Sequence, residues 1–479
     1  MNEGALIRGQ KTGDVSGEPQ VVFIDGIVRS GGGTFIDNAV GMSTYLRHVY
    51  ITGTNDIIQS GSESTVTAAG TWKRVNEYAY TDQQSINASS RIYPCESLID
   101  GSKSSTAEPA TDIDASVDAP TTDYIDRHII EQPRIDDGPY VDIVVDHSAT
   151  EGPSIEQGEI YAGGNDDTAD SLAAIHAAIA AASSAGHNRV FVPRGIFYIT
   201  DTIVLLADTI FFGTGYGTSI IAPRSNWQPT SQVYMLRSAD DAAGTASLTN
   251  IMLHTRIQGG TGDGITAPRQ YDWFSWVHWR TGGDSVVAGP IAHNQFAGKG
   301  AVLCQPKQYF TLTGNGGGRW YAITPQFKPS GHADCRIWQI TGTSEPLQIY
   351  GANLELGKNA SSGNECDYQM EVQSASNIRV YGDKREGYGD STYINDSSNI
   401  GIFGFGRQSL NRANDVHGIY GTSDDIVIGL SLCDGTDKSI GSDGMVAEDL
   451  DTEDAVQINH ATGCSIYRRG TPDDSAMYT

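Results

Sequence analysis

The 479-residue sequence predicts an all-β protein, a right-handed parallel β-helix with an alanine-rich helix capping its N-terminal end. Short apolar runs closed by asparagine, aspartate or glycine recur along the chain, and three of them begin at Asn377, Asn399 and Asp425. Repeats of this length are typical of stacked coils. The one clear helical pattern, residues 169–182, precedes most of these runs. A β-propeller is the alternative, but it needs four-stranded blades of roughly 40 residues, which the sequence does not show.

The chain divides into three regions by composition. Residues 1–60 hold β-type runs at 21–24, 31–36 and 45–51, and predict a partial second β-helix or a β-rich segment. Residues 61–159 are rich in Ser, Thr, Asp and Pro and are expected to form a connector. Residues 160–479 are expected to form the main β-helix.

The capping helix has a recognisable start. Residues 165–168 (Asn-Asp-Asp-Thr) offer N-cap side chains, and Leu172, Ile175 and Ile179 follow on one helical face. Asp166 and Asp167 are better explained as acids at the positive end of the helix than as metal ligands. The strand-like runs 189–193, 195–199, 202–205 and 210–213 come next. A helix at this place would cover the exposed edge of the first coil.

The charge and cysteine patterns exclude several classes of function. The net charge of −27 argues against a nucleic-acid partner. Lysine is scarce among the basic residues, which fits either a salt-adapted (halophilic) protein or an ordinary acidic secreted one. No apolar run is long enough for a membrane span, and no signal-peptide core is visible, although an extracellular location is expected. The six cysteines are scattered, and neither a metal site nor a cofactor is predicted.

Three glutamates are the candidate catalytic residues. Residues 350–355 and 381–386 both read Tyr-Gly, three residues, Glu, which predicts that Glu355 and Glu386 occupy equivalent positions on neighbouring coils, about 4.8 Å apart. Glu371 lies between them in the sequence. Stacked carboxylates raise the pKa of at least one of them, and a neutral acid beside an ionised one suits glycosidic-bond cleavage. The alternative is that Glu355 and Glu386 are solvated turn residues.

Aromatic and basic side chains are the candidate sugar contacts. Residues 271–279 and 316–321 are dense in aromatics, which stack on sugar rings, although alternate aromatics in strands more often belong to a core. Residues 379–412 are locally basic, which fits either an acidic sugar or counter-charges for the stacked acids. The predicted substrate-binding residues are Trp273, Trp276, Arg319, Trp320, Tyr321, Gln369, Lys384 and Arg385.

Several of these segments resemble a known superfamily. Residues 165–168 with the following helix, and residues 190–199 and 213–218, resemble the pectate-lyase-3-like β-helix superfamily. Residues 314–321 and 350–355, Glu371 and residues 377–386 resemble the subgroup that contains glycoside hydrolase family 55. The resemblance implies β-helices in tandem that cleave β-1,3-glucan with inversion. It also implies that Glu371 is the general acid and Glu355 a second essential acid.

The sequence therefore predicts a carbohydrate-active enzyme that hydrolyses a polysaccharide, a β-1,3-glucan by the resemblance, through an inverting two-carboxylate mechanism. One alternative is a polysaccharide lyase on an acidic glycan, in which Lys384, Arg385 or Arg407 neutralises the uronate. The other is a non-catalytic glycan-binding or spike β-helix. The expected partner is a polysaccharide, and the expected state is a monomer or a trimer.

Overall fold

The structure is a computed structural model. It describes residues 7–8, 20–38, 43–54, 56–60, 66–80, 83–84, 92–93, 96–99, 102–103, 111–151, 170–215, 218–224, 227, 229–253, 274–289, 308–323, 326–327, 336–356, 368–387, 390–409, 417–420, 422–435, 447–448, 456–458 and 465–468.

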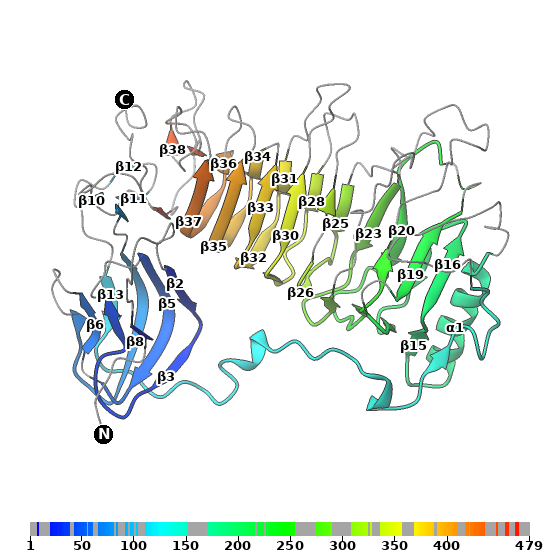
Figure 1. Ribbon diagram of the computed structural model, residues 1–479, viewed down its shortest axis with the longest axis horizontal. Helices are drawn as coiled ribbons and strands as arrows, with labels where there is room; N and C mark the ends of the chain where they lie inside the picture. Colours follow the sequence, from blue (N-terminus) through cyan, green and yellow to red (C-terminus); the bar gives the residue numbers. More distant parts are fainter. Residues whose placement is uncertain are drawn as a thin grey trace.

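The main body is a parallel β-helix, as predicted, and its described strands form three rows (Figure 1). The first row comprises β14 (Val141–Asp142), β15 (Arg189–Val192), β18 (Ile210–Gly213), β21 (Ser247–Thr249), β24 (Val286–Ala288), β26 (Gly318–Tyr321), β29 (Leu347–Tyr350), β32 (Ser376–Tyr381), β35 (Ser398–Ser409), β37 (Asp424–Gly435) and β40 (Ser465–Arg468).

The second row has two described parts: β16 (Gly195–Ile199), β19 (Ser219–Pro223) and β22 (Met252–Leu253), then β27 (Gln326–Phe327), β30 (Asn353–Leu356) and β33 (Lys384–Gly387). The third row comprises β17 (Ile203–Leu205), β20 (Val233–Ser238), β23 (Phe274–Trp279), β25 (Gln308–Thr313), β28 (Arg336–Thr341), β31 (Tyr368–Gln373), β34 (Asp390–Asn395), β36 (His417–Tyr420), β39 (Val456–Ile458) and β38 (Ala447–Glu448).

The coil repeat inferred from the sequence is confirmed by the strand register. Ile378, Ile400 and Ile426 occupy equivalent positions on β32, β35 and β37, all paired in parallel. Each is fully or almost fully buried. The Asn-Ile and Asp-Ile steps of the sequence therefore mark the point where each coil turns its first apolar side chain into the interior.

Two asparagines shape this turn in neighbouring coils. Asn377 and Asn399 have φ of 63° and 53°, in the left-handed region that asparagine tolerates better than most residues. The Asn399 side chain donates to Oδ1 of Asn377 at 2.7 Å, and Arg379 donates to the Asn399 carbonyl at 2.5 Å. The two side chains thus form a short polar ladder along the edge of the solenoid.

We expect Asn399→Ala to lower the free energy of unfolding by about 2 kcal/mol, since it removes the hydrogen bonds of the Asn399 side chain and leaves at positive φ an alanine, which tolerates this conformation less well than asparagine does. Asn399→Gly removes the same side chain but relieves the backbone, so its cost should be about half as large. Urea denaturation of both variants measures the difference, and equal losses would contradict the backbone part of this explanation.

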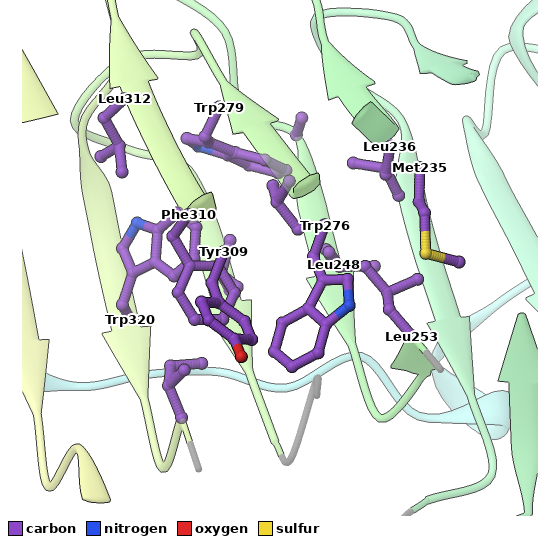
Figure 2. Close-up of a cluster of buried hydrophobic side chains, with 14 of the residues drawn as sticks. Met235, Leu236, Leu248, Leu253, Trp276, Trp279, Tyr309, Phe310, Leu312 and Trp320 are labelled. Atoms are coloured by element: carbon purple, nitrogen blue, oxygen red, sulfur yellow. The ribbon is translucent and has the colours of Figure 1, made fainter. Parts of the chain in front are cut away.

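The interior of the solenoid is filled by large apolar side chains. Trp276, Trp279, Trp320 and Trp338 are all fully buried, and Trp320 lies 4.9 Å from Trp338 between ring centroids. Figure 2 shows several of these rings between the strands, together with Phe310 and Leu312 of β25. One continuous core therefore runs through all coils from β14 to β37.

Helix α1 (Leu172–Ser184) closes the first coil (Figure 1). Its buried face carries Ile175, Ala178, Ile179 and Ala182, which join the solenoid core. The helix begins after the predicted start, and Oδ1 of Asp170 accepts the Leu172 N–H at 3.1 Å. The predicted N-cap residues 165–168 lie outside the described residues. The predicted capping role of the helix is borne out.

The N-terminal region differs from the expected boundaries. β2 (Gln20–Ile24) and β3 (Ile27–Arg29) both pair in parallel with β5 (Ser43–Thr52), as in a short β-helix. β1 (Ile7–Arg8), β4 (Ile36–Asn38) and β6 (Asp56–Ser60) form a second parallel set, which β7 (Val66–Thr67) ends. However, β8 (Trp72–Tyr80) and β13 (Thr111–Asp114) close the first set antiparallel, inside the stretch expected to be connector.

The boundary differs because β8 buries apolar side chains such as Val75 and Tyr78, although polar residues dominate the composition of this stretch. The N-terminal domain therefore extends to about Asp114. Four short strands, β9 (Gln83–Gln84), β10 (Ile92–Tyr93), β11 (Glu96–Ile99) and β12 (Ser102–Lys103), fall in the same stretch. β11 pairs antiparallel with β40, the last strand of the first row.

Residues 115–140, here called the connecting segment, run from the N-terminal domain along the outside of the first row to α1's end of the solenoid (Figure 1). They include the 3-10 helices η1 (Asp126–His128) and η2 (Ile135–Asp137). Arg319 donates to the Ile129 carbonyl at 2.7 Å, and Asn250 donates to Gln132 at 3.3 Å. The segment ends where β14 pairs with β15, so the solenoid begins at Val141 rather than near residue 160.

Within the described part of the chain, no helix combines the length and apolar character needed to cross a membrane.

Candidate functional site

Glu371 lies on the outer side of the third row, in line with residues of the neighbouring coils. The register of β28, β31 and β34 pairs Gln339 with Glu371 and Glu371 with Tyr393. Adjacent parallel strands bring such side chains about 4.8 Å apart. A polar row thus runs along the solenoid at this position.

A departure from strand alternation brings Arg336 to the same side. The Cα pairing of β28 with β31 passes from Arg336–Tyr368 to Trp338–Met370 and leaves out the residue between. Ile337 and Trp338 are both fully buried, so two consecutive side chains enter the core. Because one extra residue points inward, Arg336 and Gln339, the first and fourth residues of β28, lie on the same outer side of the strand.

Glu371 is held by two side chains. It forms an ion pair with the Arg336 guanidinium, and Nε2 of Gln339 donates to its Oε2 at 3.3 Å. Only 8% of Glu371 is exposed. A carboxylate this well covered is fixed in position, and its Arg336 partner compensates the cost of covering the charge.

Aromatic faces complete the cluster. The rings of Tyr368 and Tyr393 are stacked at 4.6 Å and 30°, and Arg336 lies 5.5 Å from the Tyr368 ring centre. Burial, and then the negative charges of Glu371 and Asp396, raise the pKa of Tyr393, so its hydroxyl stays a proton donor. We call Arg336, Gln339, Tyr368, Glu371 and Tyr393 the Glu371 cluster.

The polar row continues toward α1's end of the solenoid through His278 of β23, which is aligned with Thr311 and Arg237. Its Nε2 is 2.7 Å from Oγ1 of Thr313, and its ring lies 4.5 Å from that of Tyr234. Burial, and then the positive charges of Arg280 and Arg237, lower the pKa of His278 to about 4. The imidazole is therefore neutral at physiological pH.

This pKa predicts acid destabilisation with a definite sign. An unfolded histidine binds its proton near pH 6.5 and folded His278 only near pH 4, so between these values the unfolded state holds more protons. Stability should fall as the pH drops through this interval, by on the order of 2 kcal/mol after allowing for solvent screening. Urea denaturation across the interval measures the slope, which should be smaller in His278→Gln, and an unchanged slope would contradict the assignment.

Three predicted sugar-binding residues lie in the interior instead. Trp276, Trp320 and Gln369 are fully buried, and Figure 2 shows both indoles inside the solenoid. Trp276 and Gln369 stand at the inward-pointing extra position of the third row, and the Trp320 N–H donates to the Gly317 carbonyl at 3.1 Å. These side chains build the core and are not available to a glycan on the surface.

The other described candidates lie on different rows from Glu371. Arg319 and Tyr321 belong to β26 of the first row, where Tyr321 is 46% exposed. Arg319 is engaged with the connecting segment and lies 3.9 Å from Asp284. Lys384 is exposed on β33 of the second row. The predicted site residues are therefore spread around the solenoid rather than gathered at one place.

The predicted alignment of Glu355 with Glu386 is confirmed by the pairing of β30 with β33, and Gln408 follows on the next coil. Arg385 pairs with Arg407 in the same way. The side chains of these five residues and all of Trp273 lie outside the described residues. Both glutamates stand in the second row, whereas Glu371 stands in the third, so the three acids do not form one ladder.

Arg336, Gln339, Tyr368 and Tyr393 were not predicted from the sequence. The sequence did hold a signal for Tyr393. Glu371 lies six residues before Asn377, and Tyr393 lies six residues before Asn399 at the equivalent turn of the next coil, so the two side chains share one position of the repeat. Arg336 had no such signal, since strict alternation places it on the opposite side from Gln339. Among the described residues, no group of three or more His, Cys, Asp or Glu side chains is placed to hold a metal ion.

Comparison with known proteins agrees with this architecture. The family described as rhamnogalacturonase A/epimerase, pectate lyase-like, matches residues 161–287, which confirms the resemblance to the pectate-lyase-like β-helix superfamily inferred from the sequence. No curated protein matches the chain.

Solved structures give distant likenesses. The tailspike protein 2 enzymatically active domain of bacteriophage CBA120 is 12% identical, with a TM-score of 0.39, over 62% of this chain and 40% of that one. The adhesin PfbA of Streptococcus pneumoniae is 10% identical, with a TM-score of 0.35, over 63% and 87%. The mannuronan C-5 epimerase AlgE4 A-module of Azotobacter vinelandii is 13% identical, with a TM-score of 0.24, over 63% and 92%. This chain thus spans less than half of the tailspike it matches.

Proposed function

We propose that the protein works outside the cell on a polysaccharide and hydrolyses its glycosidic bonds at the Glu371 cluster. The observation that carries this proposal is a nearly covered carboxylate, held by Arg336 and Gln339, beside the stacked rings of Tyr368 and Tyr393. Phenol faces pack against sugar rings, while carboxylate, amide and guanidinium groups bind sugar hydroxyls. The pectate-lyase-like resemblance supports a carbohydrate as the ligand.

Hydrolysis with inversion requires two carboxyl groups. Water forms a bond to the anomeric carbon while the bond to the leaving oxygen breaks, one carboxylate takes the water proton, and the other carboxyl group protonates the leaving oxygen. Glu371 is one of the pair, and Glu355 or Glu386 of the second row is the candidate for the other. Such pairs are about 6.5–9.5 Å apart, which leaves room for the water. A β-1,3-glucan is the first substrate to test.

A lyase acting on an acidic glycan is the second candidate, favoured by Arg336 beside Glu371. In that reaction a base removes the proton α to the uronate carboxylate, the glycosidic C–O bond breaks, and a carbon–carbon double bond forms. Arg336 would neutralise the uronate, while the raised pKa of Tyr393 keeps a proton available for the leaving oxygen. The two reactions give chemically different products.

Incubation of the full chain with neutral and acidic polysaccharides, followed by mass spectrometry, tests both. Hydrolysis adds one water per bond cleaved, and we expect this mass on a β-1,3-glucan. A lyase gives products lighter by that water, which absorb in the ultraviolet through the new double bond. Saturable binding without any product, particularly by a trimer, would overturn both and favour a non-catalytic spike.

A further inference from the structure

The departure from strand alternation found in β28 repeats along the third row. Each parallel pairing from β20 to β34 leaves out the equivalent residue. The outward positions on either side of that residue therefore form two files along the solenoid, with about 4.8 Å between neighbouring coils. The first file includes Tyr234, Arg336 and Tyr368, and the second includes His278, Glu371 and Tyr393.

The same pair of aromatic positions is occupied twice on this surface. Tyr234 of the first file lies 4.5 Å from His278 of the second file on the next strand, with an angle of 32° between the rings. Tyr368 and Tyr393 stand in the same two positions, at 4.6 Å and 30°. All four side chains are half-buried. The ring arrangement of the Glu371 cluster therefore has a counterpart nearer to α1, here called the Tyr234–His278 pair.

Neighbouring side chains hold the Tyr234–His278 pair in place. The Tyr234 hydroxyl is hydrogen-bonded to the side chain of Thr311 on β25, two strands further along the row. Nε2 of His278 is 2.7 Å from Oγ1 of Thr313. Because both rings are already fixed, a ligand that packs against them immobilises few further side-chain bonds. The exposed guanidinium of Arg237, aligned with His278, adds hydrogen-bond donors beside the rings.

The two aromatic pairs are separated by a distance that a short glycan covers. In the third row β23, β25 and β28 lie between β20 and β31, so the pairs are four strand spacings apart. This separation is roughly 19 Å along the solenoid. Consecutive sugar rings of an extended glycan follow one another at a spacing similar to that of parallel strands. A chain of several sugars that lies along the two files therefore contacts both pairs at once.

We propose that the Tyr234–His278 pair is a second sugar-binding subsite, which holds a glycan along the solenoid axis while another part of the same chain occupies the Glu371 cluster. The ligand is a pyranose ring, which packs against an aromatic face and exchanges hydrogen bonds with imidazole and guanidinium groups. The direction of the chain rests on the proposed function of the Glu371 cluster, whereas binding at Tyr234 does not require that any bond is cleaved. Two linked subsites make the affinity depend on chain length.

Isothermal titration calorimetry of the full chain carrying Glu371→Gln, here called the parent, tests the subsite without turnover. The probes are a hexasaccharide and a trisaccharide of β-1,3-linked glucose, and the same two lengths of galacturonate, which distinguish a neutral glycan from an acidic one. A trisaccharide is too short to reach from one pair to the other. The parent should therefore prefer the hexasaccharide, and adding Tyr234→Ala should reduce this preference about ten-fold.

Two control variants separate sugar stacking from other effects. Tyr234→Phe keeps the ring and loses the hydroxyl bonded to Thr311, so it should retain most of the preference for the longer chain. Tyr321→Ala removes an exposed ring of the first row and should bind both lengths as the parent does. If Tyr234→Ala keeps the full preference, the proposal is wrong.

Hydroxyl-radical footprinting of the parent gives a second measurement that needs no substitution at Tyr234. The bound hexasaccharide should lower modification of Tyr234 several-fold and leave that of Tyr321 unchanged. A bound hexasaccharide that does not protect Tyr234 would overturn the subsite. Failure of the proposed function has a different sign, since it appears as a wild type that yields no products from a glycan that it binds.

Discussion

Replacing Trp320 by alanine is expected to lower the free energy of unfolding by about 3–5 kcal/mol. The indole is fully buried and has Trp279, Phe310 and Trp338 around it at centroid distances of 5.8, 5.6 and 4.9 Å. These rings are fixed by neighbouring coils, so they have little freedom to move into the space that the indole leaves. The substitution also removes the N–H that satisfies the buried Gly317 carbonyl.

The next residue of β26 provides a matched control. Tyr321 is 46% exposed, and Tyr321→Ala should change stability by less than about 1 kcal/mol. Urea denaturation followed by circular dichroism measures both stabilities. The dependence of the unfolding free energy on urea concentration should also be compared between variants, because a solenoid can lose single coils before the rest unfolds. If Tyr321→Ala cost as much as Trp320→Ala, the assignment of Trp320 to the core and Tyr321 to the surface would be wrong.

The coils were predictable because every coil of a parallel β-helix repeats the same local structure. Each coil must turn at the same edge and then bury an apolar side chain, so Asn377-Ile378, Asn399-Ile400 and Asp425-Ile426 share one pattern. The Tyr-Gly pairs that begin at Tyr350 and Tyr381 predicted the alignment of Glu355 with Glu386 in the second row for the same reason. The N-terminal boundary was not predictable from composition, because β8 buries few residues in a polar stretch.

The site was less predictable, for two physical reasons. Strict alternation assigns Trp276 and Gln369 to the outside of the third row, whereas the extra inward residue buries them and moves Arg336 next to Glu371. The hydrogen bond from Tyr381 to Asp25 joins residues 356 positions apart, and no repeat in the sequence connects them. Such contacts follow from how the connecting segment lies along the solenoid, which composition does not determine.

The largest expected effect on activity is that of Glu371→Gln, which should reduce polysaccharide cleavage by about 10²–10⁴-fold. The amide has nearly the same shape and still accepts a hydrogen bond from Arg336, so the strand should keep its conformation. It cannot exchange a proton with water or with a leaving oxygen at neutral pH. The loss should therefore appear in kcat, measured on whichever glycan the wild type cleaves, with KM changed much less.

Two further measurements distinguish a chemical role for Glu371 from a structural one. Glu345→Gln replaces an acid at the turn between β28 and β29 and should keep full activity. Arg336→Lys retains the positive charge but loses the planar guanidinium, so it should shift the pH profile of kcat while leaving measurable turnover. If Glu371→Gln lowered only the stability and not kcat, the Arg336–Glu371 pair would be a structural link of the third row, and the catalytic carboxylates would have to be sought in the second row at Glu355 and Glu386.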